Sequence, residues 1–430
     1  MAIPVRWRVA VFLFVAAGLN YADRTALSSV IPPLRSDLGI TDAQVGLAGM
    51  LFLWCYAIAS PFAGNIADRF SRSQIVTWSL IAWSLVTVST GLVQSVTMLL
   101  AMRVVLGVAE SFYLPAAGAL LADHHGPASR GKAMGFHMLG LNLGLILGGS
   151  AAGLLAEYYN WRIGFWILGG LGLLLALTSK LFLSDGPAQT STRADKPPAA
   201  TAKQAWHYLL RVPTFYCLLV SAMVAGVASW IFLSWLPLFF SETYGMTLGA
   251  AGLAGVALYK APVFAGIAIG GWLSDVAARR VRRGRSMVKA LSYLVSAPFL
   301  FLFIGAPTFA LVAATMVISS LIRAIGLPSE HALICDVIPA RFRSTAIGMF
   351  NTCGSAAGGV GVLLAGIFKK DLGLGVIFGA SSFLYILAGL TLLVAYWFFI
   401  SRDMDRADAF EASAGTTPYS PRRHNPESLA

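Results

Sequence analysis

The chain has 430 residues, of which 57% are hydrophobic and only 12% are charged, and its mean hydropathy is +0.73. A soluble globular protein carries about 25% charged residues, so these charges are too few to solvate several soluble domains. Lipid can solvate an apolar exterior instead. The composition therefore excludes a disordered chain, a disulfide scaffold and a soluble enzyme, and it predicts an all-α protein that crosses a membrane many times.

The net charge of +12 would favour nucleic-acid binding in a soluble domain, but the positions of the basic residues give a simpler explanation. Of the 31 Lys and Arg residues, 23 fall on the side of the N-terminus, four on the other side and four inside apolar spans. By the positive-inside rule, this asymmetry predicts a cell (inner) membrane protein with both termini in the cytoplasm. The densest basic cluster is interpreted as a topology signal that touches anionic lipid: Arg279, Arg280, Arg282, Arg283 and Arg285.

Twelve apolar stretches are each long enough to cross about 30 Å of hydrocarbon. Their approximate cores are 7–33, 44–67, 74–95, 98–123, 132–157, 161–183, 213–240, 248–274, 286–305, 308–337, 344–368 and 374–400.

A polar stretch rich in Pro, Ala and Thr divides these spans into two sets of six. We predict an N-terminal bundle over 1–184, a cytoplasmic linker over 185–211, a C-terminal bundle over 212–401 and a disordered tail over 402–430. The two halves also repeat one another, because Arg103 and Glu110 have the same spacing as Arg323 and Glu330. A parallel repeat of this kind places a binding site at the midplane between the halves.

Two motifs carry a family resemblance. The loop after the second span contains Gly64, Asp68, Arg69 and Arg72, and a degenerate copy after the eighth span contains Gly271 and Asp275, with Arg279 and Arg280 downstream. The fourth span contains the pattern Arg103, Gly107, Glu110. In these features the chain resembles the major facilitator superfamily. The resemblance implies twelve transmembrane helices in two six-helix bundles related by pseudo-twofold symmetry.

The segment Asn20-Tyr21-Ala22-Asp23-Arg24, together with Arg103 and Glu110, resembles two groups of that superfamily. One is the anion:cation symporters, which take up sugar acids and other organic anions, and the other is the Spinster-like transporters, whose animal members move lysolipids. Drug/proton antiporters carry a Gly-Pro-x-x-Gly-Gly element in the fifth span. This chain has glycines there but no proline, which disfavours that alternative.

Seven ionisable residues lie inside the predicted spans, where each charge costs about 2.5–3.5 kcal/mol even on the lenient insertion scale. They must face one another or a water-filled cavity. Four are positive and three are negative, which leaves room for one anion. The seven residues are Asp23, Arg24, Arg103, Glu110, Lys260, Arg323 and Glu330.

For the substrate, we expect Arg24 to reach into the cavity, because a guanidinium binds both oxygens of a carboxylate or phosphate. Lys260 supplies a second positive contact from the other half. Further candidate binding residues are Asn20, Tyr21, Tyr259 and Arg323. The alternative is that these charges form internal salt bridges that serve only packing.

For proton coupling, we expect Asp23 to pair with Arg103, and Asp23 and Glu110 to exchange protons as a substrate competes for an arginine. His137 and Glu330 are further candidates. The alternative for each carboxylate is permanent ionisation inside a fixed pair.

At the cytoplasmic edge, we expect a gate in which Asp68 caps a neighbouring helix and Arg130 is its partner. Its candidate residues are Gly64, Asp68, Arg69, Arg72, Arg130 and Asp275.

The sequence thus predicts a monomeric transporter that moves a small organic anion with protons by alternating access. It contains no metal-ligand or phosphate-cradling motif, so we expect no enzyme, no cofactor, no metal and no nucleic-acid partner. The alternatives are a Spinster-like lysolipid exporter, a drug or metabolite antiporter, and a sensor derived from a transporter. Sugar acids, aromatic acids, short carboxylates and phosphorylated lipids all satisfy the same arginine and lysine chemistry.

Overall fold

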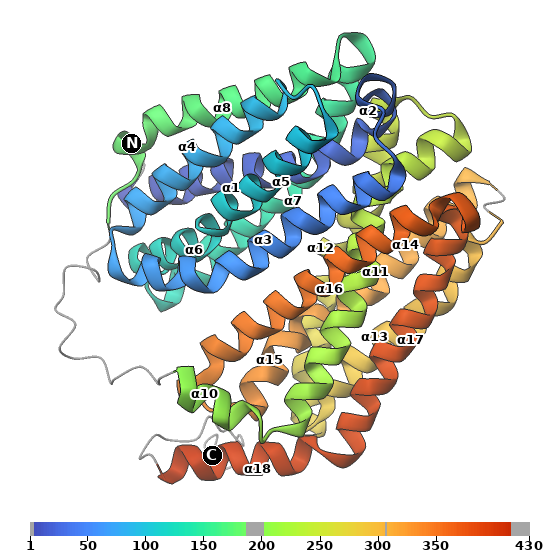
Figure 1. Ribbon diagram of the computed structural model, residues 1–430. Helices are drawn as coiled ribbons and strands as arrows, with labels where there is room; N and C mark the ends of the chain where they lie inside the picture. Colours follow the sequence, from blue (N-terminus) through green and yellow to red (C-terminus); the bar gives the residue numbers. More distant parts are fainter. Residues whose placement is uncertain (1–3, 186–201, 306–307, 414–430) are drawn as a thin grey trace.

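The computed structural model describes residues 4–185, 202–305 and 308–413, which form two helical bundles that lie side by side (Figure 1). The helices of the N-terminal bundle are α1 (Val5–Ser29), α3 (Asp42–Arg69), α4 (Arg72–Thr90), α5 (Val96–Ser111), α6 (Tyr113–His124), α7 (Pro127–Tyr158) and α8 (Trp161–Phe182). The helices of the C-terminal bundle are α11 (Pro213–Tyr244), α12 (Leu248–Arg280), α13 (Gly284–Leu300), α14 (Phe309–Ile325), α15 (Leu327–Val337), α16 (Arg343–Leu372) and α17 (Leu374–Phe398).

Three short helices lie at the ends of the bundles. Helices α10 (Ala202–Leu209) and α18 (Ile400–Ser413) lie at the end of the molecule where α1 also begins, which we call the terminal face. Helix α2 (Ile31–Leu38) follows α1 at the opposite face (Figure 1).

Eleven helical segments of the described chain are long and apolar enough to cross a membrane. The remaining predicted span, 74–95, corresponds to α4, whose Ser and Thr residues lower its hydropathy. Helix α4 packs against α5 and α8 inside the N-terminal bundle. The prediction of an all-α membrane protein with twelve spanning helices in two bundles is therefore confirmed.

The fourth and tenth spans are each interrupted at the same place in the repeat. Helix α5 gives way to α6 at Phe112, and α14 gives way to α15 at Gly326. Each break comes shortly before a proline, Pro115 or Pro328, whose ring has no N–H to donate to the preceding turn. The two prolines are 213 residues apart, so the folded repeat matches Glu110 with Arg323. The match of Arg103 and Glu110 with Arg323 and Glu330, which are 220 residues away, is therefore wrong, because equal spacing within each pair does not fix the offset between the halves.

The chain ends differ from the sequence prediction. The first span stops at Ser29 rather than near residue 33, because Pro32 and Pro33 suit the first turn of a new helix, α2. The predicted disordered tail is wrong for residues 402–413, which belong to α18. The rest of that tail, 414–430, lies outside the described residues, as does 186–201 of the predicted linker.

Helix α18 is ordered because it buries one apolar face against the C-terminal bundle. The Phe410 ring lies 5.5 Å from the Tyr208 ring of α10 and 5.6 Å from the Phe342 ring, centroid to centroid. On its polar side, Arg282 donates to Asp408 at 2.5 Å. Aromatic packing therefore holds α10 and α18 together on the terminal face, and the ion pairs of Arg282 add to the contacts of α18.

The two bundles approach each other closely only in their halves near the opposite face. A Cβ atom added to Gly46 of α3 would lie 2.8 Å from the Val362 carbonyl oxygen of α16, and one added to Gly252 of α12 would lie 2.6 Å from the Gly149 carbonyl oxygen of α7. Such contacts join helix backbones directly. In the halves near the terminal face, a Cβ would meet nothing within 4 Å at the glycines Gly64, Gly131, Gly271 and Gly348 of the same four helices. The ribbons diverge toward that face (Figure 1).

Candidate functional site

A buried ion pair joins α1 to α5. Both Nε and Nη2 of Arg24 lie 2.9 Å from Oε2 of Glu110, and the two side chains are 5% and 0% exposed. The Arg24 guanidinium carbon also lies 4.2 Å from the Tyr21 ring centroid and 4.8 Å from that of Tyr56. Arg24 further donates to the Asn20 side chain at 3.4 Å. The arginine expected to bind substrate is thus neutralised by the carboxylate expected to carry a proton.

The predicted pairing of Asp23 with Arg103 is not present as an ion pair. The Thr87 hydroxyl of α4 donates to the Asp23 carboxylate, and Arg103 is near enough to attract it without a bond. Oδ1 of Asp23 and both Nε and Nη2 of Arg103 are buried without a hydrogen-bond partner among the described residues. The pairing prediction is wrong because a hydroxyl from a third helix holds the carboxylate.

His137 lies inside the core of the N-terminal bundle. Its Nε2 is 3.0 Å from the Tyr113 hydroxyl, which donates to the Leu13 carbonyl oxygen at 2.8 Å. Since the hydroxyl proton is used, the His137 ring donates from Nε2 and is held in one tautomer. This arrangement places His137 in a local hydrogen-bond chain between α1 and α7.

The C-terminal bundle contributes two cations around one tyrosine. The Arg323 guanidinium carbon and the Lys260 amine nitrogen each lie 5.1 Å from the Tyr259 ring centroid, and that ring stacks on Phe232. In the part of the chain that the structure describes, neither cation takes part in an ion pair. Two positive charges in this bundle therefore have no neutralising carboxylate.

Lys289 is a buried charge that was not among the seven predicted inside the spans. Its side chain is 2% exposed, its amine forms an ion pair with Glu330, and it lies 4.5 Å from the Tyr293 ring centroid. Glu330 is thus paired with Lys289, and no ion pair joins it to Arg323 among the described residues. Lys289 lies three residues inside the predicted ninth span, 286–305, and this position could have indicated a charge buried in the membrane.

A cavity of about 50 Å³ lies between the bundles. Arg24 and Arg103 line it from the N-terminal bundle, and Trp230 and Ser234 line it from the C-terminal bundle. Arg103 and Arg24 are therefore the predicted site residues that face this space together. Over residues 4–185, 202–305 and 308–413, no three His, Cys, Asp or Glu side chains are grouped so that they could hold a metal ion.

At the terminal face, the repeat produces two equivalent ion pairs. Arg72 pairs with Asp123 in the N-terminal bundle, and Arg285 pairs with Asp336 at 2.7 Å in the C-terminal bundle. The two arginines are 213 residues apart in the sequence, and so are the two aspartates. Arg285 therefore takes the basic position of the second motif copy, and it also approaches Asp275 at 3.7 Å. The assignment of that position to Arg279 and Arg280 is wrong, because only the folded chain reveals the register.

Arg130 and Arg343 have matching roles at the start of α7 and α16. Arg130 donates to the carbonyl oxygens five and eight residues before it, at 3.3 Å each, and Arg343 does the same at 2.9 Å each. Each arginine thus satisfies the C-terminal carbonyls of the preceding helix. The Asp68 side chain, its expected partner, lies outside the described residues. Gly64 and Arg69 lie in the last turns of α3.

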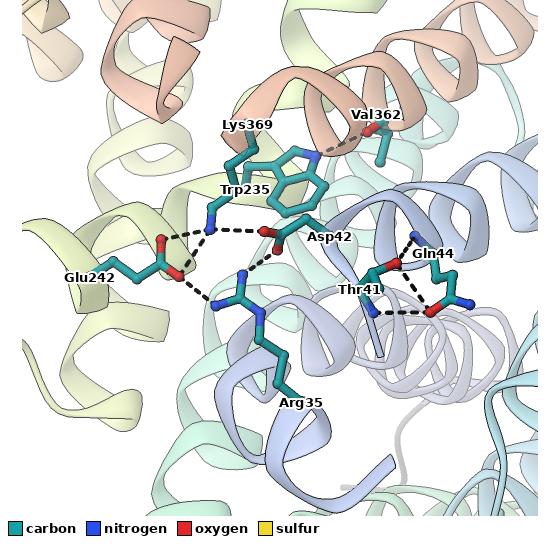
Figure 2. Close-up of polar contacts among 8 residues, drawn as sticks. All are labelled: Arg35, Thr41, Asp42, Gln44, Trp235, Glu242, Val362 and Lys369. Carbon is teal, nitrogen blue, oxygen red and sulfur yellow. Dashed lines mark hydrogen bonds and ion pairs between the residues drawn. The ribbon is translucent and has the colours of Figure 1, made fainter. Parts of the chain in front are cut away.

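A ring of four alternating charges joins the bundles at the opposite face, and the sequence analysis missed it (Figure 2). Arg35 of α2 and Asp42 of α3 are ion-paired within the N-terminal bundle. Across the interface, Arg35 donates to Glu242 of α11 at 2.7 Å, and Lys369 of α16 donates to Asp42 at 3.2 Å. Within the C-terminal bundle, Lys369 also donates to Glu242 at 3.0 Å. We call these four residues the opposite-face latch.

The sequence also matches a known protein family. The model of the Major Facilitator Superfamily matches residues 13–288 and 256–426. The chain belongs to the Major Facilitator Superfamily. It is therefore a multi-pass membrane transporter and not an enzyme.

Relatives in sequence include the Oryza sativa subsp. japonica protein named "Probable anion transporter 4, chloroplastic", which is 27% identical over 89% of this chain and 67% of its own. The hexuronate transporter of Bacillus subtilis is 25% identical over 85% of this chain and 88% of its own. Among solved structures, a bacterial homologue of the human lysosomal transporter Spinster, crystallised inward-facing and unoccupied, has a TM-score of 0.74. That likeness has 21% identity, covers 95% of this chain and 99% of the other, and concerns the fold. Both groups that the motifs resemble are thus represented.

Proposed function

We propose that this transporter moves a small organic anion, with a sugar acid or other carboxylate as the substrate class, coupled to protons by alternating access. The observation that carries the proposal is a charge imbalance at the centre of the molecule. Arg24 with Glu110 and Lys289 with Glu330 are neutral pairs. Of the seven charges predicted inside the spans, Arg103, Lys260 and Arg323 have no ion pair with any described residue, and Asp23 is the one carboxylate of the seven without one.

Buried charge without a counter-charge is costly, so an anionic ligand that enters between the bundles relieves that cost. Names of relatives such as the hexuronate transporter support the same substrate class. In this proposal Arg103 contacts the anion from one bundle, and Lys260 and Arg323 contact it from the other. Asn20, Tyr21 and Tyr259 shape the site.

Coupling follows from the Arg24–Glu110 pair. When Glu110 takes a proton, it releases Arg24, which lines the cavity and can then bind a carboxylate as a fork. Loss of the proton restores the pair and displaces the anion. Asp23, held by Thr87, is the second proton site. We assign the terminal face to the cytoplasmic side of the cell membrane, so this conformation is open toward the cytoplasm. We also propose that the transporter works as a monomer.

The test is uptake into proteoliposomes with an imposed pH gradient, screened over radiolabelled sugar acids, aromatic acids and short carboxylates, with a lysophospholipid as the comparison substrate. We expect proton-driven uptake of at least one carboxylate, its loss in Arg24→Ala and Asp23→Asn, and normal uptake in Lys180→Gln, whose lysine is exposed in α8. Wild-type rates in both Arg24→Ala and Asp23→Asn would overturn the site. Transport of the lysophospholipid alone would overturn the substrate class.

A further inference from the structure

An apolar groove of about 590 Å³ lies on the C-terminal bundle between the terminal-face halves of α12 and α13. This volume is within the range of about 300–1,000 Å³ that small-molecule sites occupy. Its walls are aliphatic, with Ile322 and Ile325 of α14 among them. Leu291 and Val295, also in its lining, are 47% and 51% exposed, as expected for side chains that meet lipid.

The groove belongs to one bundle and is separate from the substrate cavity. Its lining residues all come from the C-terminal bundle, from α12, the Val281 that follows it, α13, α14 and α17, whereas the substrate cavity is lined from both bundles. Both α12 and α13 are membrane-spanning helices. A molecule that enters this groove therefore comes from the bilayer.

One end of the groove is basic and lies where α12 ends at the terminal face. Arg280, the last residue of α12, lines the groove at this end, and the half-buried Tyr396 of α17 is also in its lining. A tyrosine and a guanidinium in the lining of an apolar slot match the headgroup region of a membrane. The groove thus has an apolar body and a cationic end.

The structure also divides the basic cluster that the sequence analysis treated as one unit. Arg282 pairs with Asp405 and Asp408, Arg283 donates to the Tyr396 carbonyl oxygen at 2.9 Å, and Arg285 pairs with Asp336. These three arginines therefore contact other groups of the protein itself. Arg279 and Arg280 are exposed, and neither has an ion pair or a side-chain hydrogen bond in the described ranges.

We propose that an anionic phospholipid of the terminal-face leaflet occupies this groove, with an acyl chain along α12 and α13 and its phosphate on Arg280 and Arg279. A guanidinium binds phosphate oxygens two at a time, which suits a headgroup at the end of the groove. The aliphatic lining excludes a polar solute, and the free arginines select against a zwitterionic lipid. The cluster is therefore a lipid site in addition to a topology signal.

The test is native mass spectrometry of the full-length protein released from nanodiscs that contain phosphatidylglycerol and phosphatidylcholine with identical chains. We expect phosphatidylglycerol to stay bound in preference to phosphatidylcholine. Arg280→Gln should weaken that retention about fivefold, since one basic residue near a membrane surface contributes about 1 kcal/mol. Lys180→Gln, which removes an exposed charge from the other bundle, should leave it unchanged.

Val295→Trp separates a groove from a merely basic surface, because it fills the slot and keeps every arginine. It should also abolish retention, and Leu291→Trp provides a second filling variant if the first does not fold. Retention unchanged in a folded filling variant would overturn the groove, and retention unchanged in Arg280→Gln would overturn the arginine contact. Equal retention of the two lipids, or displacement of the lipid by soluble glycerol phosphate, would overturn the choice of an anionic lipid.

Discussion

At the scale of single residues, the central charges differ in how they are compensated. Arg24 and Glu110 compensate each other in a site closed to solvent, and an aromatic cage of Tyr21 and Tyr56 covers the guanidinium. A buried pair of this kind gains little over an apolar pair of the same volume, but its halves depend on each other. This dependence makes the pair suitable as a switch that a proton can open.

We therefore predict that Glu110→Ala lowers the free energy of unfolding by about 3–5 kcal/mol, because it leaves the Arg24 charge buried and unpaired. The double variant Arg24→Leu/Glu110→Leu should be more stable than the single one. Urea unfolding in detergent, followed by tryptophan fluorescence, measures both. A single variant that is as stable as the double variant would contradict the dependence.

The sequence was enough to predict most of the charged residues that lie inside the membrane, but not which residues they pair with. Asp23 was expected to pair with Arg103, yet the Thr87 hydroxyl of α4 holds its carboxylate, and Glu330 pairs with Lys289, a partner that was not predicted. Helix periodicity tells which residues share a face of one helix. It carries no information on which other helix supplies the neighbouring group.

At the scale of elements, the helices that join the bundles use glycine to bring backbones together near the opposite face. At Gly252 of α12, an added Cβ would meet the Gly149 carbonyl oxygen and the Ser29 hydroxyl, at 2.6 and 2.8 Å. At Gly271, further along the same helix, the space is open. One helix thus has a contact half and a free half, which is what a rocking element requires.

We predict that Gly252→Ala opens the contact between the bundles at the opposite face, because the added Cβ would meet the Gly149 backbone, which cannot rotate away as a side chain can. Gly271→Ala should have no effect, because the space around Gly271 is open. The overpacking should destabilise the arrangement that is closed at the opposite face by about 1–3 kcal/mol. The measurement is the alkylation rate of a cysteine introduced by Ser28→Cys, which lines the enclosed cavity, in a chain without its native cysteines. Equal alkylation rates in the two glycine variants would count against this interpretation.

At the scale of the whole molecule, the opposite-face latch crosses between bundles at the surface (Figure 2). Lys369 reaches both Asp42 and Glu242, as Arg35 does, and its pair with Asp42 is one of the two that cross between the bundles. Its side chain is 12% exposed, which limits screening by salt. The latch therefore stabilises the arrangement in which the bundles are closed at this face.

We predict that Lys369→Gln shifts the molecule about fivefold toward an opposite-face-open arrangement, on the basis of about 1 kcal/mol for partly exposed ion pairs. The matched control is Lys370→Gln, whose exposed lysine lies next in the chain and outside the latch. Electron spin resonance distances between labels placed by Ser36→Cys and Asp371→Cys report the shift. The same distance distribution in both variants would refute a role for the latch.

The sequence alone determined the class of this protein, its twelve helices, its repeat and most of the charges inside the membrane, since hydropathy and motif spacing are local properties. Tertiary structure decided which charges neutralise each other, that Lys289 is buried, that α18 packs on the terminal face, and that the latch closes the opposite one. Those features depend on contacts between residues of different helices, from 41 positions apart for Lys289 and Glu330 to 327 for Lys369 and Asp42. Only the folded chain brings such residues together, and the charges left unpaired after folding are what support an anion as the substrate.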